Sequence, residues 1–137
     1  MCKIFKKNHG IKFLSFNVEG LDSELEDVSF LELLNNHDIC PLNETWRTDN
    51  SKIDLPGFWD FSVVKSKRTK RGRPSGGLTI FCKESIGKGV KIESFSEGVV
   101  WLKLDKRFFN LPNYLFIGDV YIPPEYSSNV LPKIGYF

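Results

Sequence analysis

Hydrophobic positions along the first third of the chain follow two different periods, which predict its strands and helices. Residues Ile11–Val18 are rich in β-formers and nearly alternate at the start, which predicts a strand buried mostly on both faces. Over residues 21–34 the apolar positions recur every three or four residues, which predicts one amphipathic helix capped by Asp22 or Ser23. A second strand at Ile39–Leu42 follows directly. The opening of the chain is therefore predicted to be a βαβ unit.

The rest of the chain is predicted to form short strands separated by polar loops. These strands cover Phe58–Val64, Leu78–Phe81, Val90–Phe95, Val99–Leu104 and Tyr114–Ile122. The pattern predicts one α/β domain over residues 11–124, between a basic leader at residues 1–10 and an irregular tail at residues 125–137.

Composition supports a folded domain. The chain has 137 residues, of which 41% are hydrophobic, and its 12 Phe and 3 Trp are enough to build a core. Trp59 and Trp101 are predicted to belong to that core. The net charge of +2 is compatible with a polyanionic partner but does not require one.

Three features predict a soluble, intracellular protein without membrane contact. Cys2, Cys40 and Cys82 are far apart and odd in number, which argues against a disulfide framework and a Cys-rich zinc site. The basic N-terminus is not followed by the apolar segment of a secretory signal. No apolar run approaches the length that spans a bilayer.

The stretch from Ile39 to Trp46 carries the first candidate chemistry, because an apolar run ends there on an acid. Burying an ionised carboxylate is costly unless it is paired or bound to a metal, and ligands bind at the carboxyl ends of strands in open α/β sheets. Glu44 is therefore predicted to hold a hard cation, and Asn17, at the end of the preceding strand, to present its amide to the same pocket. The structural alternatives are a surface acid at Glu44 and an Asx turn at Asn17. Thr45 and Trp46 are interpreted as supports for Glu44.

A basic loop follows the third predicted strand. It contains six cations and no acid, namely Lys65, Lys67, Arg68, Lys70, Arg71 and Arg73. The loop is either a solvated turn or a contact to nucleic-acid phosphates, for which Arg68, Lys70, Arg71 and Arg73 are the candidates. Such contacts would be independent of sequence and sensitive to salt.

Four short motifs in a fixed order carry a family resemblance. They are Phe16-Asn17-Val18-Glu19-Gly20-Leu21, Leu42-Asn43-Glu44-Thr45-Trp46, Ser75-Gly76-Gly77-Leu78-Thr79-Ile80 and Val120-Tyr121-Ile122-Pro123-Pro124. On these motifs the chain resembles the N-terminal half of the endonuclease/exonuclease/phosphatase superfamily. Within that superfamily it is most similar to the apurinic-type endonuclease domain of non-LTR retrotransposons.

The resemblance implies part of a DNase I-like four-layer α/β/β/α sandwich that hydrolyses DNA phosphodiesters with Mg²⁺, or with Mn²⁺ in its place. It implies that Glu44 binds the metal, that Asn17 positions active-site groups and phosphate, and that Tyr121 contacts the phosphate. Simple packing before the prolines is the alternative for Tyr121. In an intact parent the resemblance further implies an attached reverse transcriptase domain and a nuclear location.

The chain departs from the family pattern in its second half. The family's Gly-Asp-x-Asn and Ser-Asp-His motifs are not found in the sequence. Asp119 belongs to a Gly-Asp-Val sequence that lacks the Asn and precedes Tyr121, so Asp119 is interpreted as a strand residue. The only histidines are His9 and His37.

These departures predict a truncated copy that is inert by itself and leaves a sheet face and a strand edge uncovered. Three functions remain open at this point. They are the metal-dependent endonuclease, a non-enzymatic remnant with weak affinity for nucleic acid, and a phosphatase of the same superfamily.

Overall fold

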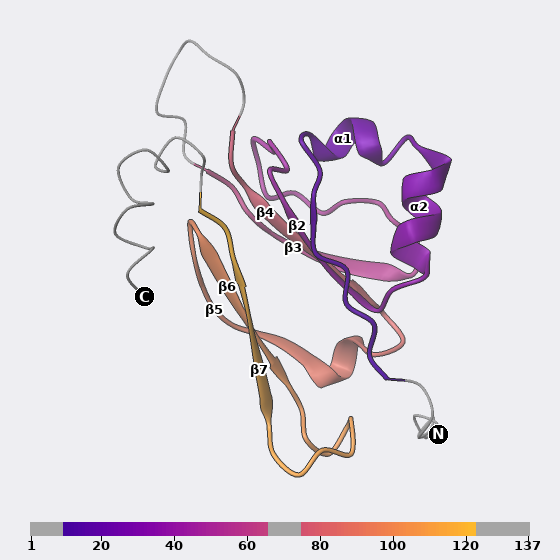
Figure 1. Cartoon of the computed structure of the whole chain (residues 1–137), viewed down its shortest axis with the longest axis vertical. Coiled ribbons are helices and arrows are strands. Elements are labelled where there is room, and N and C mark those ends of the chain that lie inside the picture. Colours follow the sequence, from indigo (N-terminus) through magenta and orange to yellow (C-terminus); the bar gives the residue numbers. More distant parts are fainter. Residues whose placement is uncertain (1–9, 66–74, 123–137) are drawn as a thin grey trace, which may run out of the picture.

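The computed structural model describes residues 10–65 and 75–122, and its strands form two sheets (Figure 1). Sheet A has the order β1-β2-β4-β3, with β1 at Phe16–Asn17, β2 at Ile39–Asn43, β3 at Phe58–Val63 and β4 at Leu78–Lys83. Sheet B has the order β5-β6-β7, with β5 at Val90–Ser96, β6 at Val99–Leu104 and β7 at Leu115–Val120. The helices are α1 at Leu21–Glu24, α2 at Val28–Asn35 and the short 3-10 helix η1 at Gly87–Gly89.

Two apolar clusters hold these elements in three layers. One cluster joins α1 and α2 to sheet A through residues such as Leu21, Leu34 and Phe81. The other fills the space between the sheets and includes Ile80 and Leu102. The helices therefore cover one face of sheet A, and sheet B covers the other (Figure 1). A second helical layer, which the four-layer sandwich requires, is not found within residues 10–65 and 75–122.

The predicted βαβ opening is confirmed. Strands β1 and β2 pair in parallel, with Phe16 opposite Leu42 and Asn17 opposite Asn43. Strand β4 runs antiparallel to both β2 and β3, so sheet A is mixed. Because the two strands are parallel, their carboxyl ends lie at the same end of the sheet.

The first strand is much shorter and more exposed than predicted. Only Phe16–Asn17 forms β1, and an isolated parallel bridge joins Phe13 to Ile39. Phe13 is 40% and Phe16 is 41% exposed. The expectation of a strand buried on both faces is wrong because β1 lies at the edge of sheet A, where only β2 flanks it among the described strands.

The predicted single helix is in fact two helices. Asp27 adopts an extended backbone, and its carboxylate accepts a hydrogen bond from the Ser29 N–H at 2.8 Å, which caps α2. This cap interrupts the apolar period, whereas α1 begins after Gly20 without a side-chain cap, so the predicted caps Asp22 and Ser23 are wrong. Both helices are short, and in the described part of the chain no helix has the length and apolar character to cross a membrane.

The strands of sheet B begin and end within two residues of their predicted bounds. The predicted burial of two tryptophans is confirmed for one and wrong for the other. Trp59 packs against the cluster between the sheets, as predicted. Trp101 is 42% exposed, because its neighbours Val100 and Leu102 point toward sheet A and alternation directs Trp101 outward. Phe116 on the neighbouring strand β7 is also exposed. The prediction of an uncovered apolar sheet face is thus confirmed for the described residues.

Candidate active site

Glu44 follows β2 directly and has an unusual backbone. Its φ is 58° and that of Trp46 is 59°, so two non-glycine residues occupy the left-handed region. Such residues cost about 1–3 kcal/mol each and persist where the surrounding structure holds them. Here the N–H groups of Gly20 and Leu21 donate to the carbonyls of Glu44 and Thr45, at 2.9 and 3.0 Å.

Two glycines fix the other side of this segment. The N–H groups of Thr45 and Trp46 donate to the carbonyls of Gly77 and Gly76, at 3.3 and 3.1 Å. Both glycines have positive φ, and a Cβ on Gly77 would lie 2.6 Å from Thr45 Oγ1. The Gly-Gly pair before β4 therefore allows the chain to approach the Glu44 segment closely.

The Glu44 carboxylate is held by three donors. It is 8% exposed, and its Oε2 accepts hydrogen bonds from Trp46 Nε1 at 2.7 Å and from the Gly76 N–H at 3.1 Å. Its Oε1 accepts from the Tyr121 hydroxyl. The alternative of a surface acid is therefore wrong, and the support expected from Trp46 is a direct hydrogen bond.

The environment of Glu44 favours its charged form. Burial acts to raise the pKa of this carboxyl, but the hydrogen bonds from Tyr121, Trp46 and Gly76, together with the Lys65 charge, outweigh burial. The net result is a pKa below the ordinary value for glutamate. The carboxylate is therefore ionised at neutral pH, which is the form that binds a cation.

Asn17 lies at the same end of sheet A as Glu44. It pairs with Asn43, the residue before Glu44, and the Val18 N–H donates to the Asn43 carbonyl at 2.9 Å. Asn17 is exposed, and none of the three donors to the Glu44 carboxylate is Asn17. The predicted placement of the two residues at one edge is confirmed, whereas their functional roles stay predictions.

Three side-chain oxygens near this end are buried without a hydrogen-bond partner in the described structure. They are Asn43 Oδ1, Thr45 Oγ1 and Asp119 Oδ2. Burial raises the pKa of Asp119. The interpretation of Asp119 as a strand residue is confirmed by its place in β7, whereas the burial of its carboxyl was not predicted.

The oxygen atoms at this site fit a magnesium ion better than a zinc ion. Within residues 10–65 and 75–122 no three His, Cys, Asp or Glu side chains gather in a way that could hold a metal. Mg²⁺ uses one or two carboxylates and keeps several waters, and amide oxygens are suitable further ligands. The Glu44 carboxylate and the buried, unpartnered Asn43 Oδ1 are oxygen atoms of these two kinds.

Tyr121 reaches Glu44 from the second sheet. It follows β7, and its N–H donates to the Gly98 carbonyl at 3.0 Å. Its hydroxyl donates to Glu44, which is 77 positions earlier in the chain. Tyr121 is therefore more than a packing residue before a proline turn, and its predicted contact with phosphate stays a prediction.

The ends of the basic loop lie beside this site. Lys65 Nζ donates to Ser75 Oγ at 3.1 Å, and the Lys65 charge acts on Glu44. The next residue, Gly76, donates to the Glu44 carboxylate. The candidate phosphate contacts lie outside the described residues, and they are Arg68, Lys70, Arg71 and Arg73.

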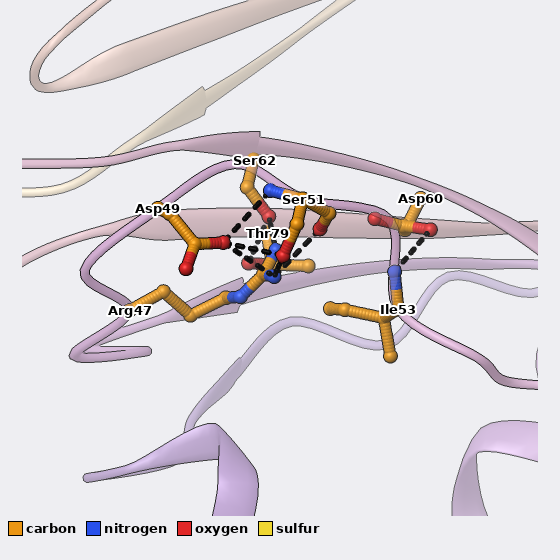
Figure 2. Close-up of polar contacts among 7 residues, drawn as sticks. All are labelled: Arg47, Asp49, Ser51, Ile53, Asp60, Ser62 and Thr79. Atoms are coloured by element: carbon orange, nitrogen blue, oxygen red, sulfur yellow. Dashed lines mark hydrogen bonds and ion pairs between the residues drawn. The ribbon is translucent and has the colours of Figure 1, made fainter.

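An arginine network that the sequence analysis missed anchors the loop after Trp46 (Figure 2). Arg47 donates to Ser62 Oγ at 2.7 Å and to the Ser51 carbonyl at 2.6 Å, and it lies 3.7 Å from the Asp49 carboxylate. Ser62 Oγ in turn contacts Thr79 Oγ1 at 2.8 Å. The only sequence signal was an arginine directly after the Glu-Thr-Trp motif.

Histidine chemistry is not available at this site from the described residues. His37 Nδ1 contacts the Leu33 carbonyl at 2.7 Å. His37 lies just before the start of β2, whereas Glu44 follows the end of this strand. His9 lies outside the described residues.

Comparisons with known proteins give a distant likeness to solved structures. No model of a protein family matches the chain, and no curated protein matches it. One matching solved structure is that of an AP endonuclease from Archaeoglobus fulgidus, at 17% sequence identity and a TM-score of 0.41. The alignment covers 69% of this chain and 37% of that chain. This likeness is too distant to assign a function to the chain.

Proposed function

We propose that the chain carries the metal-binding half of a Mg²⁺-dependent phosphodiesterase site that acts on DNA, of the retrotransposon endonuclease type. The observation that carries this proposal is the buried, ionised Glu44 carboxylate, which donors from both sheets fix at the end of β2. The order of the four sequence motifs supports the endonuclease type. Glu44 and the Asn43 amide oxygen would hold the ion.

The residues of the chain would bind and orient the phosphate. A bound divalent cation supplies stabilisation of charge on the phosphoryl and leaving oxygens. The Tyr121 hydroxyl, which donates to Glu44 in this structure, can instead donate to a phosphate oxygen. Asn17 presents an exposed amide at the same edge of sheet A, and the basic loop would add affinity that does not depend on sequence.

We further propose that this chain binds DNA without cleaving it by itself. The sequence lacks the Gly-Asp-x-Asn and Ser-Asp-His motifs, and His37 lies at the far end of β2. Among the described residues the site would offer groups for a cation and a phosphate, but no described histidine lies near it to activate water. Nucleic-acid binding without catalysis is the function that these two observations favour for the isolated chain.

Duplex-DNA binding and plasmid nicking test both proposals. Glu44→Gln removes the charge from the site, and the exposed Glu32→Gln is a matched control on the helical layer. We expect Mg²⁺ to strengthen DNA binding of the wild type and of Glu32→Gln several-fold, and to leave Glu44→Gln unchanged. We expect no nicking of supercoiled plasmid by any of the three proteins.

The outcomes test the metal site at Glu44 and the inertness of the chain separately. Equal Mg²⁺ responses in the wild type and Glu44→Gln would overturn the metal-site proposal, as would nicking that survives Glu44→Gln. Nicking that disappears with Glu44→Gln would support the site and contradict the inertness of the chain. Faster hydrolysis of a small phosphomonoester than of DNA would instead favour the phosphatase.

A further inference from the structure

We propose that Asp119, on sheet B, is the second carboxylate ligand of the cation site. The other protein ligands would be Asn43 and Glu44, on sheet A. The inference rests on the proposed function, because it assigns further ligands to the same ion. It gives a role to two buried oxygens that the hydrogen bonds of the protein leave unused.

Asp119 is an unusual residue for the inner face of a sheet. It is 8% exposed, and its Oδ2 has no hydrogen-bond partner in the described structure. Buried carboxyl groups are costly unless they are paired, hydrogen-bonded or bound to a metal. Asp119 pairs across the ladder with Val100, a member of the cluster between the sheets, so its side chain faces sheet A.

Asn43 faces the same space from the other side. It lies four residues after Ile39, and thus on the same face of β2, and it pairs with Leu78; both Ile39 and Leu78 belong to the cluster between the sheets. Its Oδ1 is buried and unpartnered, like Asp119 Oδ2. The two unused oxygens thus come from facing surfaces of the two sheets.

The contact between Glu44 and Tyr121 places Asn43 and Asp119, the residues that carry these oxygens, near one end of the space between the sheets. Asn43 is next to Glu44, and Asp119 precedes Tyr121 by two residues, which is about 6–7 Å along a strand. The Tyr121 hydroxyl donates to Glu44. Asp119 and Glu44 therefore flank the same end of this space from opposite sheets.

A divalent cation suits this set of atoms better than a neutral partner. The amide oxygen of Asn43 is only an acceptor, and two carboxylates would bring two negative charges to a largely buried site. A bound ion of charge +2 compensates both carboxylates and accepts oxygen ligands from either sheet. It would also tie sheet A to sheet B.

Thermal unfolding and Mn²⁺ titration of the full chain test the assignment without any need for catalysis. Asp119→Asn keeps the shape and removes the charge, and Asp22→Asn is the matched control because Asp22 is exposed on α1. We expect Mg²⁺ to raise the Tm of the wild type and of Asp22→Asn. We expect Asp119→Asn to be at least as stable as the wild type without metal, to gain no Tm with Mg²⁺, and to bind Mn²⁺ at least tenfold more weakly.

A second variant changes the site in the opposite direction. Asn43→Asp adds a carboxylate, so we expect a lower Tm without metal and a larger rise with Mg²⁺ than in the wild type. This variant keeps the inference testable if Asp119→Asn does not fold.

The outcomes separate the two proposals. If Glu44→Gln abolishes the Mg²⁺ response and Asp119→Asn keeps it, the assignment of Asp119 is wrong and the proposed function stands. If both variants lose Mn²⁺ binding while Mg²⁺ has no effect on DNA binding, Asp119 is a ligand and the proposed function fails. A wild type that binds no Mn²⁺ overturns the assignment.

Discussion

Glu44 shows how a residue's chemistry depends on the backbone that presents it. The left-handed conformations of Glu44 and Trp46 let the indole N–H reach the carboxylate of a residue only two positions earlier. Strain of this kind is characteristic of functional sites, where surrounding contacts maintain it. Gly76 and Tyr121 supply those contacts from distant parts of the chain. The acid is thereby ionised although it is buried.

At this scale we predict a pH dependence of stability that comes from Glu44. Its pKa in the folded chain lies below the ordinary value, so the charged form stabilises the fold above about pH 4.3, the pKa of a free glutamate. This stabilisation is lost as the pH falls through the lower pKa of the folded state. Without metal, the difference in free energy of unfolding between the wild type and Glu44→Gln should therefore shrink as the pH falls below the pKa of a free glutamate, toward the lower pKa of Glu44 in the folded chain.

Urea unfolding at a series of pH values, with a chelator present, measures this difference. The exposed Glu32→Gln variant is again the control. If Glu44→Gln and Glu32→Gln respond to pH in the same way, the stabilising contacts of Glu44 do not act as described.

At the scale of elements, the segment after β2 joins the site to sheet A. Backbone hydrogen bonds attach residues 44–46 to the chain before α1 on one side and to the glycines before β4 on the other. The following residue, Arg47, then ties the loop to β3 and the loop's own turn (Figure 2). The position of Glu44 thus depends on three neighbouring segments at once.

We predict that Arg47→Ala lowers the free energy of unfolding by about 2–3 kcal/mol, because hydrogen bonds to a charged group are lost in a nearly buried place. The Arg47 side chain is only 9% exposed. Arg107→Ala, at an exposed position, should change stability by less than about 0.5 kcal/mol. Urea unfolding measures both variants, and equal stabilities would show that the network in Figure 2 contributes little.

At the scale of the whole molecule, sheet A has an apolar layer on each face, and each layer holds one buried cysteine, Cys40 on the side of the helices and Cys82 on the side of sheet B. Cys40 and Cys82 are fully buried and unpaired, and they lie on the adjacent strands β2 and β4. Burial raises the pKa of each thiol to about 12. Neither cysteine is therefore a nucleophile in the folded chain.

We predict that these two thiols react with a thiol reagent only when the fold opens. In a Cys2→Ser background, labelling of the native protein should be at least about 10³-fold slower than that of the urea-unfolded protein, since the folded state of a stable domain dominates by that factor or more. The rate should rise with urea in step with unfolding. Rapid labelling of Cys82 without denaturant would show that the two sheets separate easily, and rapid labelling of Cys40 would show that the helices open from sheet A.

Local patterns of residues were sufficient to predict most of the strands and their order. Period-2 runs located most strands, the apolar run before Glu44 located β2, and the βαβ order predicted the parallel pair that places Asn17 and Asn43 side by side. Alternation and strand order are properties of neighbouring residues and short connections, so they can be read without the fold. The helix break at Asp27 was missed because a cap within an apolar period has almost the same local pattern as a continuous helix.

Which side chains meet and which are buried depends on how distant segments pack together. The contact of Tyr121 with Glu44, the burial of Asp119 and the exposure of Trp101 all depend on how sheet B faces sheet A. Residues 77 positions apart have no local pattern that links them, and the alternation along a strand does not say which of its faces will be covered. The physical reason is that burial and hydrogen bonding between layers depend on the packing of distant segments, whereas strand and helix periods depend on adjacent residues.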